Sequence, residues 1–297
     1  MSTSGEAVVI WGEVLWDRFP DGDRLGGAPA NVAWHLGMAG GWARLVSRVG
    51  NDELGRRAMA QLSEYVDTEL VQVDPDRATG EVSIVLDAGE PRYTLHAGRA
   101  WDRIECPANA ASAVAEAGVL IYGTLAQRTA EGLASWRNAV AASMSTCLRV
   151  CDLNLRVADG NSPAIMEALD AADLLKVNDR ELAALARWFG WTNPIDALLA
   201  RDPRRRRLIA VTHGAAGSTL YGRGAPIELA GIPARGVGDH VGCGDAYLAI
   251  LVFGMTMGWD LEASGRAASR WAAAVASTRG ATPAFDSDRI AELLEAA

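Results

Sequence analysis

The feature that most constrains the fold is a series of short, continuously apolar segments, each followed by a turn or polar residues and then by a helical pattern. These segments occupy residues 7–13, 42–49, 119–123, 148–153, 174–177 and 208–212. Strands that are apolar on both sides must be covered on both faces, which indicates a parallel sheet between two layers of helices. The sequence therefore predicts an α/β chain with a three-layer α/β/α fold around a central, mostly parallel sheet.

The composition restricts the class of partner. The chain has 297 residues, of which 49% are hydrophobic, and a formal net charge of -9. A chain of this length and apolar content folds into a globular protein with a sizeable core. The negative charge argues against nucleic acid or an anionic membrane surface as a partner, because both would repel it.

The expected cellular location of the protein follows from its first residues, from the length of its apolar stretches and from its cysteines. The first apolar run is short and has no leader-like segment before it, and every apolar stretch is interrupted before it could cross a membrane. The four cysteines show no C-x-x-C spacing, so we expect free thiols. Together these features predict a cytoplasmic protein in a reducing compartment.

Residues 79–99 differ from the rest of the chain because apolar and polar residues alternate there. This pattern predicts an antiparallel hairpin inserted into the series of strands and helices. We expect residues 12–25 and 79–100 to form a small β lid on a single domain that spans residues 1–297. Two side chains near the end of the hairpin, His96 and Arg99, either reach a ligand or lie on an edge strand in solvent.

The segment Gly242-Cys243-Gly244-Asp245 precedes a long apolar helix. Two glycines allow backbone N–H groups to converge on one point, and the N-terminus of the helix adds its positive dipole end, so the segment favours an anion. An acid at such a point suits a general base for phosphoryl transfer to a hydroxyl. The alternative is that Asp245 caps the helix and the glycines only shape a turn.

A second group of polar residues follows the first strand. Asp17 lies after that strand, and Gly26 and Gly27 precede a helix that contains Asn31. Carboxylate and amide groups at the carboxyl edge of a sheet can bind the hydroxyls of a polyol. The alternatives are a solvated loop acid for Asp17 and a plain junction between loop and helix for Asn31.

Further candidates lie later in the chain. Asn178 and Glu181 fit a reciprocal capping box, which is compatible with a second role in binding. The glycine-rich connection after residues 208–212 would let a nucleotide approach the backbone, while small residues of the last long helix either border a flat ring or pack closely against another helix. The residues concerned are Thr212, Gly214, Gly217, Ala274 and Ser277.

Taken in this order, the motifs resemble those of the ribokinase-like, or pfkB, family of carbohydrate kinases over almost the whole chain. The resemblance implies a ribokinase-like fold and an ATP-dependent sugar kinase. Gly26, Gly27 and Asn31 match the motif that holds the sugar, and Asp17 matches an acid that binds its hydroxyls. Residues 242–245 match the motif whose amides form the anion hole and whose acid, Asp245, is the base.

The same resemblance implies the cofactors. Asn178 and Glu181 match a motif that places Mg²⁺ and phosphate, with Glu181 acting through water. Residues 212–217 match the nucleotide-side loop, and Asp239 matches a position that helps bind a monovalent cation such as K⁺. The lid hairpin of this family often pairs with another subunit, so the resemblance also implies a homodimer.

Within the family, residues 152–156 and 100–102 look most like fructokinases, with ketodeoxygluconate kinases second. Arg156 is then a substrate-side residue that suits either a hexulose or a sugar acid. Three positions depart from the family pattern: Asp179 shortens the usual Glu, His240 replaces Thr, and Cys243 replaces Ala. A thiol beside amides and a helix N-terminus predicts a lowered pKa for Cys243.

Rival functions make different demands on the sequence. A dinucleotide-dependent oxidoreductase would carry G-x-G-x-x-G after the first strand, and residues 10–13 lack it. A sugar-binding regulator without activity would lose the base or the anion hole, and both motifs are present. A nucleoside acceptor stays open as an alternative to the sugar.

Overall fold

The computed structural model describes residues 6–19, 21–87, 90–155, 163–201, 207–236 and 238–295. Its main sheet has nine strands in the order β13-β12-β11-β10-β9-β8-β1-β4-β5; β12 pairs antiparallel with both β11 and β13, and the other neighbouring strands pair parallel. The strands are β1 (Val8–Trp11), β4 (Ala43–Gly50), β5 (Val71–Asp74), β8 (Val119–Tyr122), β9 (Leu148–Asp152), β10 (Leu174–Asn178), β11 (Leu208–Thr212), β12 (Gly217–Tyr221) and β13 (Ile227–Ala230). The predicted central, mostly parallel sheet is confirmed.

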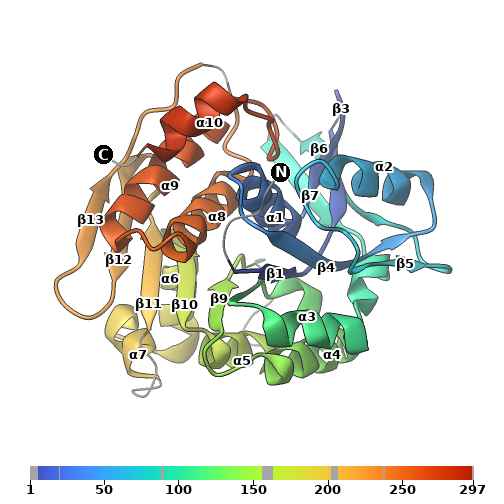
Figure 1. Ribbon diagram of the computed structural model, residues 1–297, viewed down its shortest axis with the longest axis horizontal. Coiled ribbons are helices and arrows are strands. Elements are labelled where there is room, and N and C mark those ends of the chain that lie inside the picture. The colour runs from blue at the N-terminus through green and yellow to red at the C-terminus, as the bar shows by residue number, and fades with distance from the viewer. Residues whose placement is uncertain are drawn as a thin grey trace.

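Helices cover both faces of this sheet (Figure 1). One hydrophobic cluster joins the sheet to α1 (Ala28–Met38), α2 (Glu53–Leu62), α8 (Cys243–Thr256), α9 (Leu261–Ala276) and α10 (Ser287–Leu294). A second cluster joins the other face to α3 (Ala108–Glu116), α4 (Ala130–Ala142), α5 (Pro163–Ala171), α6 (Asp179–Phe189) and α7 (Pro194–Ala200). The three-layer α/β/α prediction is therefore confirmed. In the part of the chain that the structure describes, no helix combines the length and apolar character needed to cross a bilayer.

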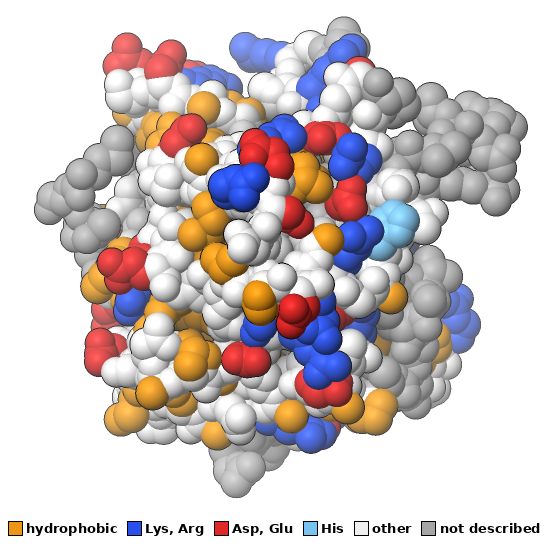
Figure 2. Space-filling model, turned by 90° about the vertical axis from the view of Figure 1, so that its right-hand side faces the viewer, with side chains coloured by type: hydrophobic (Ala, Val, Ile, Leu, Met, Phe, Trp, Pro, Cys, Tyr) orange, Lys and Arg blue, Asp and Glu red, His pale blue; other side chains and the backbone are white. Residues whose placement is uncertain are grey.

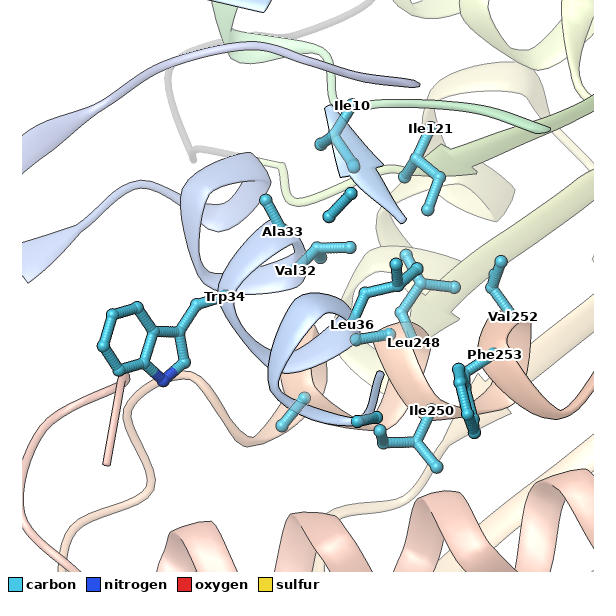
Figure 3. Close-up of a cluster of buried hydrophobic side chains, with 14 of the residues drawn as sticks. Ile10, Val32, Ala33, Trp34, Leu36, Ile121, Leu248, Ile250, Val252 and Phe253 are labelled. Atoms are coloured by element: carbon cyan, nitrogen blue, oxygen red, sulfur yellow. The ribbon is translucent and has the colours of Figure 1, made fainter. Parts of the chain in front are cut away.

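Helices α1 and α8 pack side by side on the sheet, and this packing brings two distant parts of the chain together. Figure 3 shows Val32 and Leu36 of α1 and Leu248 of α8 in one cluster with Ile10 of β1. Residues 246–254 of α8 are all buried, as its uniformly apolar sequence predicts. The N-terminal turns of both helices consequently reach the carboxyl edge of the sheet.

A second sheet of four strands stands beside the main one, in the order β3-β2-β6-β7. It is formed by β2 (Leu15–Phe19), β3 (Gly22–Gly26), β6 (Gly80–Asp87) and β7 (Glu90–Leu95), so the two predicted lid segments share one sheet. The predicted antiparallel hairpin is confirmed by the pairing of β6 with β7. Figure 2 shows the side of the molecule on the right of Figure 1, where acidic and basic side chains lie intermixed.

A buried histidine connects α1, α9 and the loop that follows α9. His35 Nδ1 accepts a hydrogen bond from Trp271 Nε1 at 3.1 Å, so Nε2 carries the proton and donates it to Ala281 O at 2.8 Å. Burial lowers the pKa of His35 to about 4, although the bond to Ala281 opposes the shift. The neutral ring therefore fixes the loop at residue 281 against α1.

Because His35 is buried as a neutral ring, we expect the folded protein to lose stability in mild acid. The unfolded chain takes up a proton at His35 near pH 6.5 and the folded chain only near pH 4, so the free energy of unfolding falls as the pH drops between these values. The loss should be about 2 kcal/mol at pH 5 and should reach about 3 kcal/mol below pH 4. Urea unfolding at pH 7, 6 and 5 measures it, with His35→Gln as the variant that lacks this proton uptake. Equal pH dependence in both proteins would contradict the assignment.

Candidate active site

The first turn of α8 is built by a glycine in the left-handed region. Gly242 is the N-cap residue with φ 75°, and a Cβ at this position would lie 2.5 Å from Ala281 Cβ. Glycine is needed there for the conformation and for the close approach of the loop. Asp245 occupies the first turn, where the helix dipole favours a carboxylate.

A hydrogen bond connects this turn to α1. Asn31 Nδ2 donates to Asp245 Oδ2 at 2.8 Å, although the two residues are 214 positions apart in sequence. Asn31 is 4% exposed, and its Oδ1 has no hydrogen-bond partner in the described part of the chain. Gly27, the N-cap of α1 with φ 101°, allows the approach, since a Cβ there would lie 2.4 Å from Glu13 O.

A buried lysine lies behind the same turn. Lys176 of β10 is level with Asp152 of β9, and its Nζ lies 2.8 and 3.1 Å from the two carboxylate oxygens. Both side chains are buried. A Cβ on Gly244 would lie 2.9 Å from Lys176 Nζ, so the second glycine of the motif leaves room for an ammonium.

The surrounding charges keep this lysine protonated. Burial disfavours the charged form, but the carboxylates of Asp152, Asp245 and Glu181 outweigh it and hold the pKa of Lys176 above its usual range. The sequence reasoning missed Lys176. The available signal was a lysine within the apolar run of residues 174–177, because lysine is rarely buried without a partner.

Glu181 organises the ends of two strands. Its Oε2 accepts from Asn178 N at 2.8 Å and its Oε1 from Leu155 N at 2.9 Å, while Asn178 Oδ1 accepts from Glu181 N. The capping box predicted from the sequence is therefore confirmed. Burial raises the pKa of Glu181, with Lys176 and the two amides acting in the opposite direction. The loop that Glu181 holds includes Asn154 with φ 40°.

Asp239 bridges the segment before α8 and the loop after α9. Its Oδ1 accepts from Val241 N at 3.1 Å and its Oδ2 from Gly280 N at 3.0 Å. Ser277 supports the same junction, since its Oγ accepts from Arg235 N at 2.9 Å. The neighbouring Ala274 of α9 is buried.

The predicted nucleotide-side residues lie beside Asn178, at the next strands of the sheet. Thr212 is level with Asn178 in the parallel pairing of β10 and β11. Gly214 and Gly217 follow with φ 58° and 111°. His213 connects α6 with β12: its Nδ1 lies 2.7 Å from Asp179 Oδ1, and its Nε2 lies 3.0 Å from Thr219 Oγ1.

The predicted sugar-side residues separate into two groups. Asp17 of β2 lies against Gly26, where a Cβ would be 2.5 Å from Asp17 Oδ2, and Gly26 leads directly into α1. Asp17 therefore lies against the start of the segment that continues through Gly27 to Asn31. Arg156 lies outside the described residues.

His96 and Arg99 lie away from Asp17. Arg99 forms an ion pair with Glu81 at 3.1 Å, and His96 Nε2 lies 2.8 Å from Ser83 Oγ. Asp17 is level with Val82 of β6, so these two side chains lie on the same face of the small sheet. Glu81 and Ser83 are the neighbours of Val82 in sequence, and because side chains alternate between the faces of a sheet, they lie on the other face. Both predicted contacts therefore lie on the face of the small sheet opposite Asp17.

Cys243 differs from the sequence prediction. Burial, together with Asp245 and Asp239, raises the pKa of Cys243 to about 12. The predicted lowering of this pKa is therefore wrong, because desolvation and two nearby carboxylates outweigh the helix N-terminus.

This result predicts an unreactive thiol whose side chain is dispensable. At pH 8 only about one molecule in 10⁴ carries the Cys243 thiolate, so iodoacetamide should label this residue far more slowly than in the unfolded chain. Cys243→Ala should keep kcat within about threefold of wild type, because the backbone N–H remains. Peptide mapping by mass spectrometry measures the labelling, and rapid modification of Cys243 in the folded protein would contradict the raised pKa.

Comparison with known sequences shows the family of the chain. The pfkB family carbohydrate kinase description matches residues 22–288. A fructokinase of Klebsiella pneumoniae is 31% identical over 267 residues, which cover 83% of this chain and 84% of that protein. Fructokinase-2 of Solanum lycopersicum is 28% identical over 275 residues, covering 84% of this chain and 82% of that one.

Solved structures give the same result. Fructokinase from Vibrio cholerae O395, in its fructose, ADP and calcium ion bound form, is 26% identical with a TM-score of 0.79 and covers 98% of this chain and 99% of its own. Fructokinase from Xylella fastidiosa with bound ATP shares the fold, with 20% identity, a TM-score of 0.85 and 98% of each chain covered. The chain belongs to the pfkB family of carbohydrate kinases and is a phosphotransferase with an alcohol group as acceptor.

Proposed function

We propose that this chain transfers the γ-phosphoryl group of ATP to a primary hydroxyl of a small sugar, namely fructose or a related ketose or sugar acid. The observation that carries the proposal is the 2.8 Å hydrogen bond between Asn31 Nδ2 and Asp245 Oδ2. It joins the segment that would hold the sugar to the carboxylate that would act as base. A hydroxyl beside Asn31 is therefore also beside Asp245.

The mechanism uses proton removal and charge stabilisation. Asp245 takes the proton of the hydroxyl as its oxygen attacks the γ-phosphorus in line; the bond from that phosphorus to the bridging oxygen breaks, and ADP leaves. The backbone amides of residues 242–244 face the negative charge of the migrating group. The dipole of α8 adds to this stabilisation.

Nucleotide and metal would lie on the side of Asn178. Thr212, Gly214 and Gly217 would border this side with small residues, of which Gly214 is exposed and the other two are partly exposed. Among the described residues, no three carboxylates, histidines or cysteines are arranged to hold a metal. Mg²⁺ normally keeps several waters and phosphate oxygens as ligands, so Glu181 would hold it through water, and the ion would neutralise phosphate charge.

The choice of acceptor rests on the sugar-side residues and the relatives. Asn31 Oδ1 is a buried acceptor that a sugar hydroxyl would satisfy. Asp17 adds a carboxylate next to Gly26. The Klebsiella pneumoniae relative is named fructokinase, and the Vibrio cholerae structure contains fructose.

A panel assay tests the function. Release of ADP would be measured with fructose, ketodeoxygluconate, ribose, mannose and nucleosides, with Mg²⁺, and with and without K⁺. We expect the highest kcat/KM with fructose or another ketose or sugar acid. A preference for a nucleoside would mean that the acceptor is a nucleoside and not a sugar. Sugar binding without ADP release would favour a regulator without catalytic activity. A response to K⁺ would support a cation near Asp239.

We also propose that two copies associate through the four-stranded sheet. Its outer strands β3 and β7 have open edges in the described chain, and such edges favour pairing with another chain. Sedimentation velocity at several protein concentrations tests this proposal, and a monomer at all of them would refute it.

A further inference from the structure

We propose that Lys176 is a positioning residue for phosphoryl transfer, whose ammonium, anchored by Asp152, holds a fixed positive charge against the Gly244 backbone and beside Asp245. This inference rests on the proposed function, because it assigns a role to a residue behind the same anion hole. It concerns a side chain that lies within the sheet and outside the two binding sides described above.

The register of the sheet creates the ion pair. Lys176 and Asp152 are direct neighbours in the parallel pairing of β10 and β9, so both side chains lie on the same face of the sheet. The Nζ–carboxylate distances of 2.8 and 3.1 Å place both carboxylate oxygens on one ammonium. Lys176 is 6% exposed and Asp152 is 3% exposed, so water screens this charge little.

The ammonium lies directly behind the first turn of α8. A Cβ on Gly244 would be 2.9 Å from Nζ, closer than non-bonded atoms normally approach. The glycine therefore serves the lysine as well as the backbone amides. A cation at this distance adds to the positive end of the helix, at the point where the migrating phosphoryl group gathers negative charge.

A role in stability alone does not explain well why the Lys176–Asp152 pair is buried here. Burying an ion pair costs desolvation free energy, and well-packed apolar residues of similar volume often give equal or greater stability. On the same face of β9 and β10, the residues two positions earlier, Val150 and Leu174, are apolar. The pair occurs where carboxylates of Asp245 and Glu181 also act on the lysine, which is where a fixed cation is useful.

The test separates the charge of Lys176 from its role in neutralising Asp152. Lys176→Met removes the charge but leaves Asp152 buried alone. Asp152→Asn keeps the ammonium, and the double variant K176M/D152N removes both charges and the unpaired carboxylate. For each protein, kcat, the KM values for ATP and for sugar, and the urea midpoint would be measured.

We expect kcat of K176M/D152N to be about 10²-fold below that of D152N, with both KM values changed by less than about threefold. Lys176→Arg should recover part of kcat because it restores the charge. Equal kcat in K176M/D152N and D152N, at any level, would overturn the proposal and leave Lys176 as a partner of Asp152 only. Larger changes in KM than in kcat would overturn it as well.

A matched control uses an ion pair with a buried carboxylate at the β5 end of the sheet. Arg48 of β4 lies 2.9 Å from Asp74 of β5, and Asp74 is buried. Arg48→Met should lower the urea midpoint and leave kcat within about twofold of wild type. If the wild-type protein phosphorylates none of the panel compounds, the proposed function fails; if wild type is active and only the Lys176 variants behave like their controls, this inference alone fails.

Discussion

Replacing Asp245 with Asn should lower kcat by about 10² to 10⁴-fold, because the amide cannot take the proton of the acceptor hydroxyl. This corresponds to roughly 3 to 5 kcal/mol of activation free energy. The side chain keeps its size, and its amide oxygen can still accept the hydrogen bond from Asn31 Nδ2, so the fold should remain. Steady-state kinetics measures the loss, and isothermal titration with ATP should show unchanged nucleotide binding.

A control carries the same substitution at the start of the next helix. Asp260 caps α9 by accepting from Ala263 N at 2.7 Å and lies on the surface. Asn caps helices as well as Asp, so Asp260→Asn should leave both stability and kcat nearly unchanged. Near-wild-type kcat in D245N would remove Asp245 from the role of base, and equal losses in both variants would indicate a general effect of the substitution.

The sheet was predictable because its strands are apolar on both sides. The pattern at residues 174–177 and 208–212 gave strands at the observed positions, and the polar residues after them lie at the carboxyl edge as expected. Helix ends were less accurate. Helix α8 begins at Cys243 although its apolar run suggests a start near Asp245, because Gly242 provides the N-cap in the left-handed region.

Contacts between distant segments could not be predicted from the spacing of residues in the sequence. The side chain of His96 contacts Ser83, and Arg99 pairs with Glu81, because the register of β2, β6 and β7 decides which face each residue occupies. A shift of one residue would reverse these faces. The pKa of Cys243 was mispredicted for a related reason: burial and nearby carboxylates depend on how α8 packs.

The contacts of the buried side chains next to the site were the hardest to predict from the sequence. Lys176 faces Asp152 only because β9 and β10 are adjacent in the sheet, and His35 meets Trp271 and Ala281 only after α1 and α9 have packed. The sequence around Lys176 and His35 gave one usable signal, namely a charged or polar residue within an apolar run. Identifying the partner required the order of the strands and helices.

Gly242→Ala should both destabilise the protein and impair catalysis. A non-glycine residue at φ 75° costs about 1 to 2 kcal/mol, and the Cβ would also meet Ala281 Cβ at 2.5 Å and Ala281 Cα at 2.7 Å. Relieving these contacts adds about 1 to 3 kcal/mol, for a total of roughly 2 to 5 kcal/mol in the free energy of unfolding. Because the amides of the first turn of α8 must move, kcat should fall on the order of 10²-fold.

Gly258 supplies the matched control, since it lies just beyond the other end of α8. Its φ is 77°, nearly the same as that of Gly242, but a Cβ there would meet no atom within 4 Å. Gly258→Ala should therefore show only the conformational cost of about 1 to 2 kcal/mol and retain kcat. Urea unfolding and steady-state kinetics on both variants separate the two effects. If G242A and G258A lose equal stability and both keep kcat, the contact with Ala281 does not position the anion hole, and the first turn of α8 tolerates displacement.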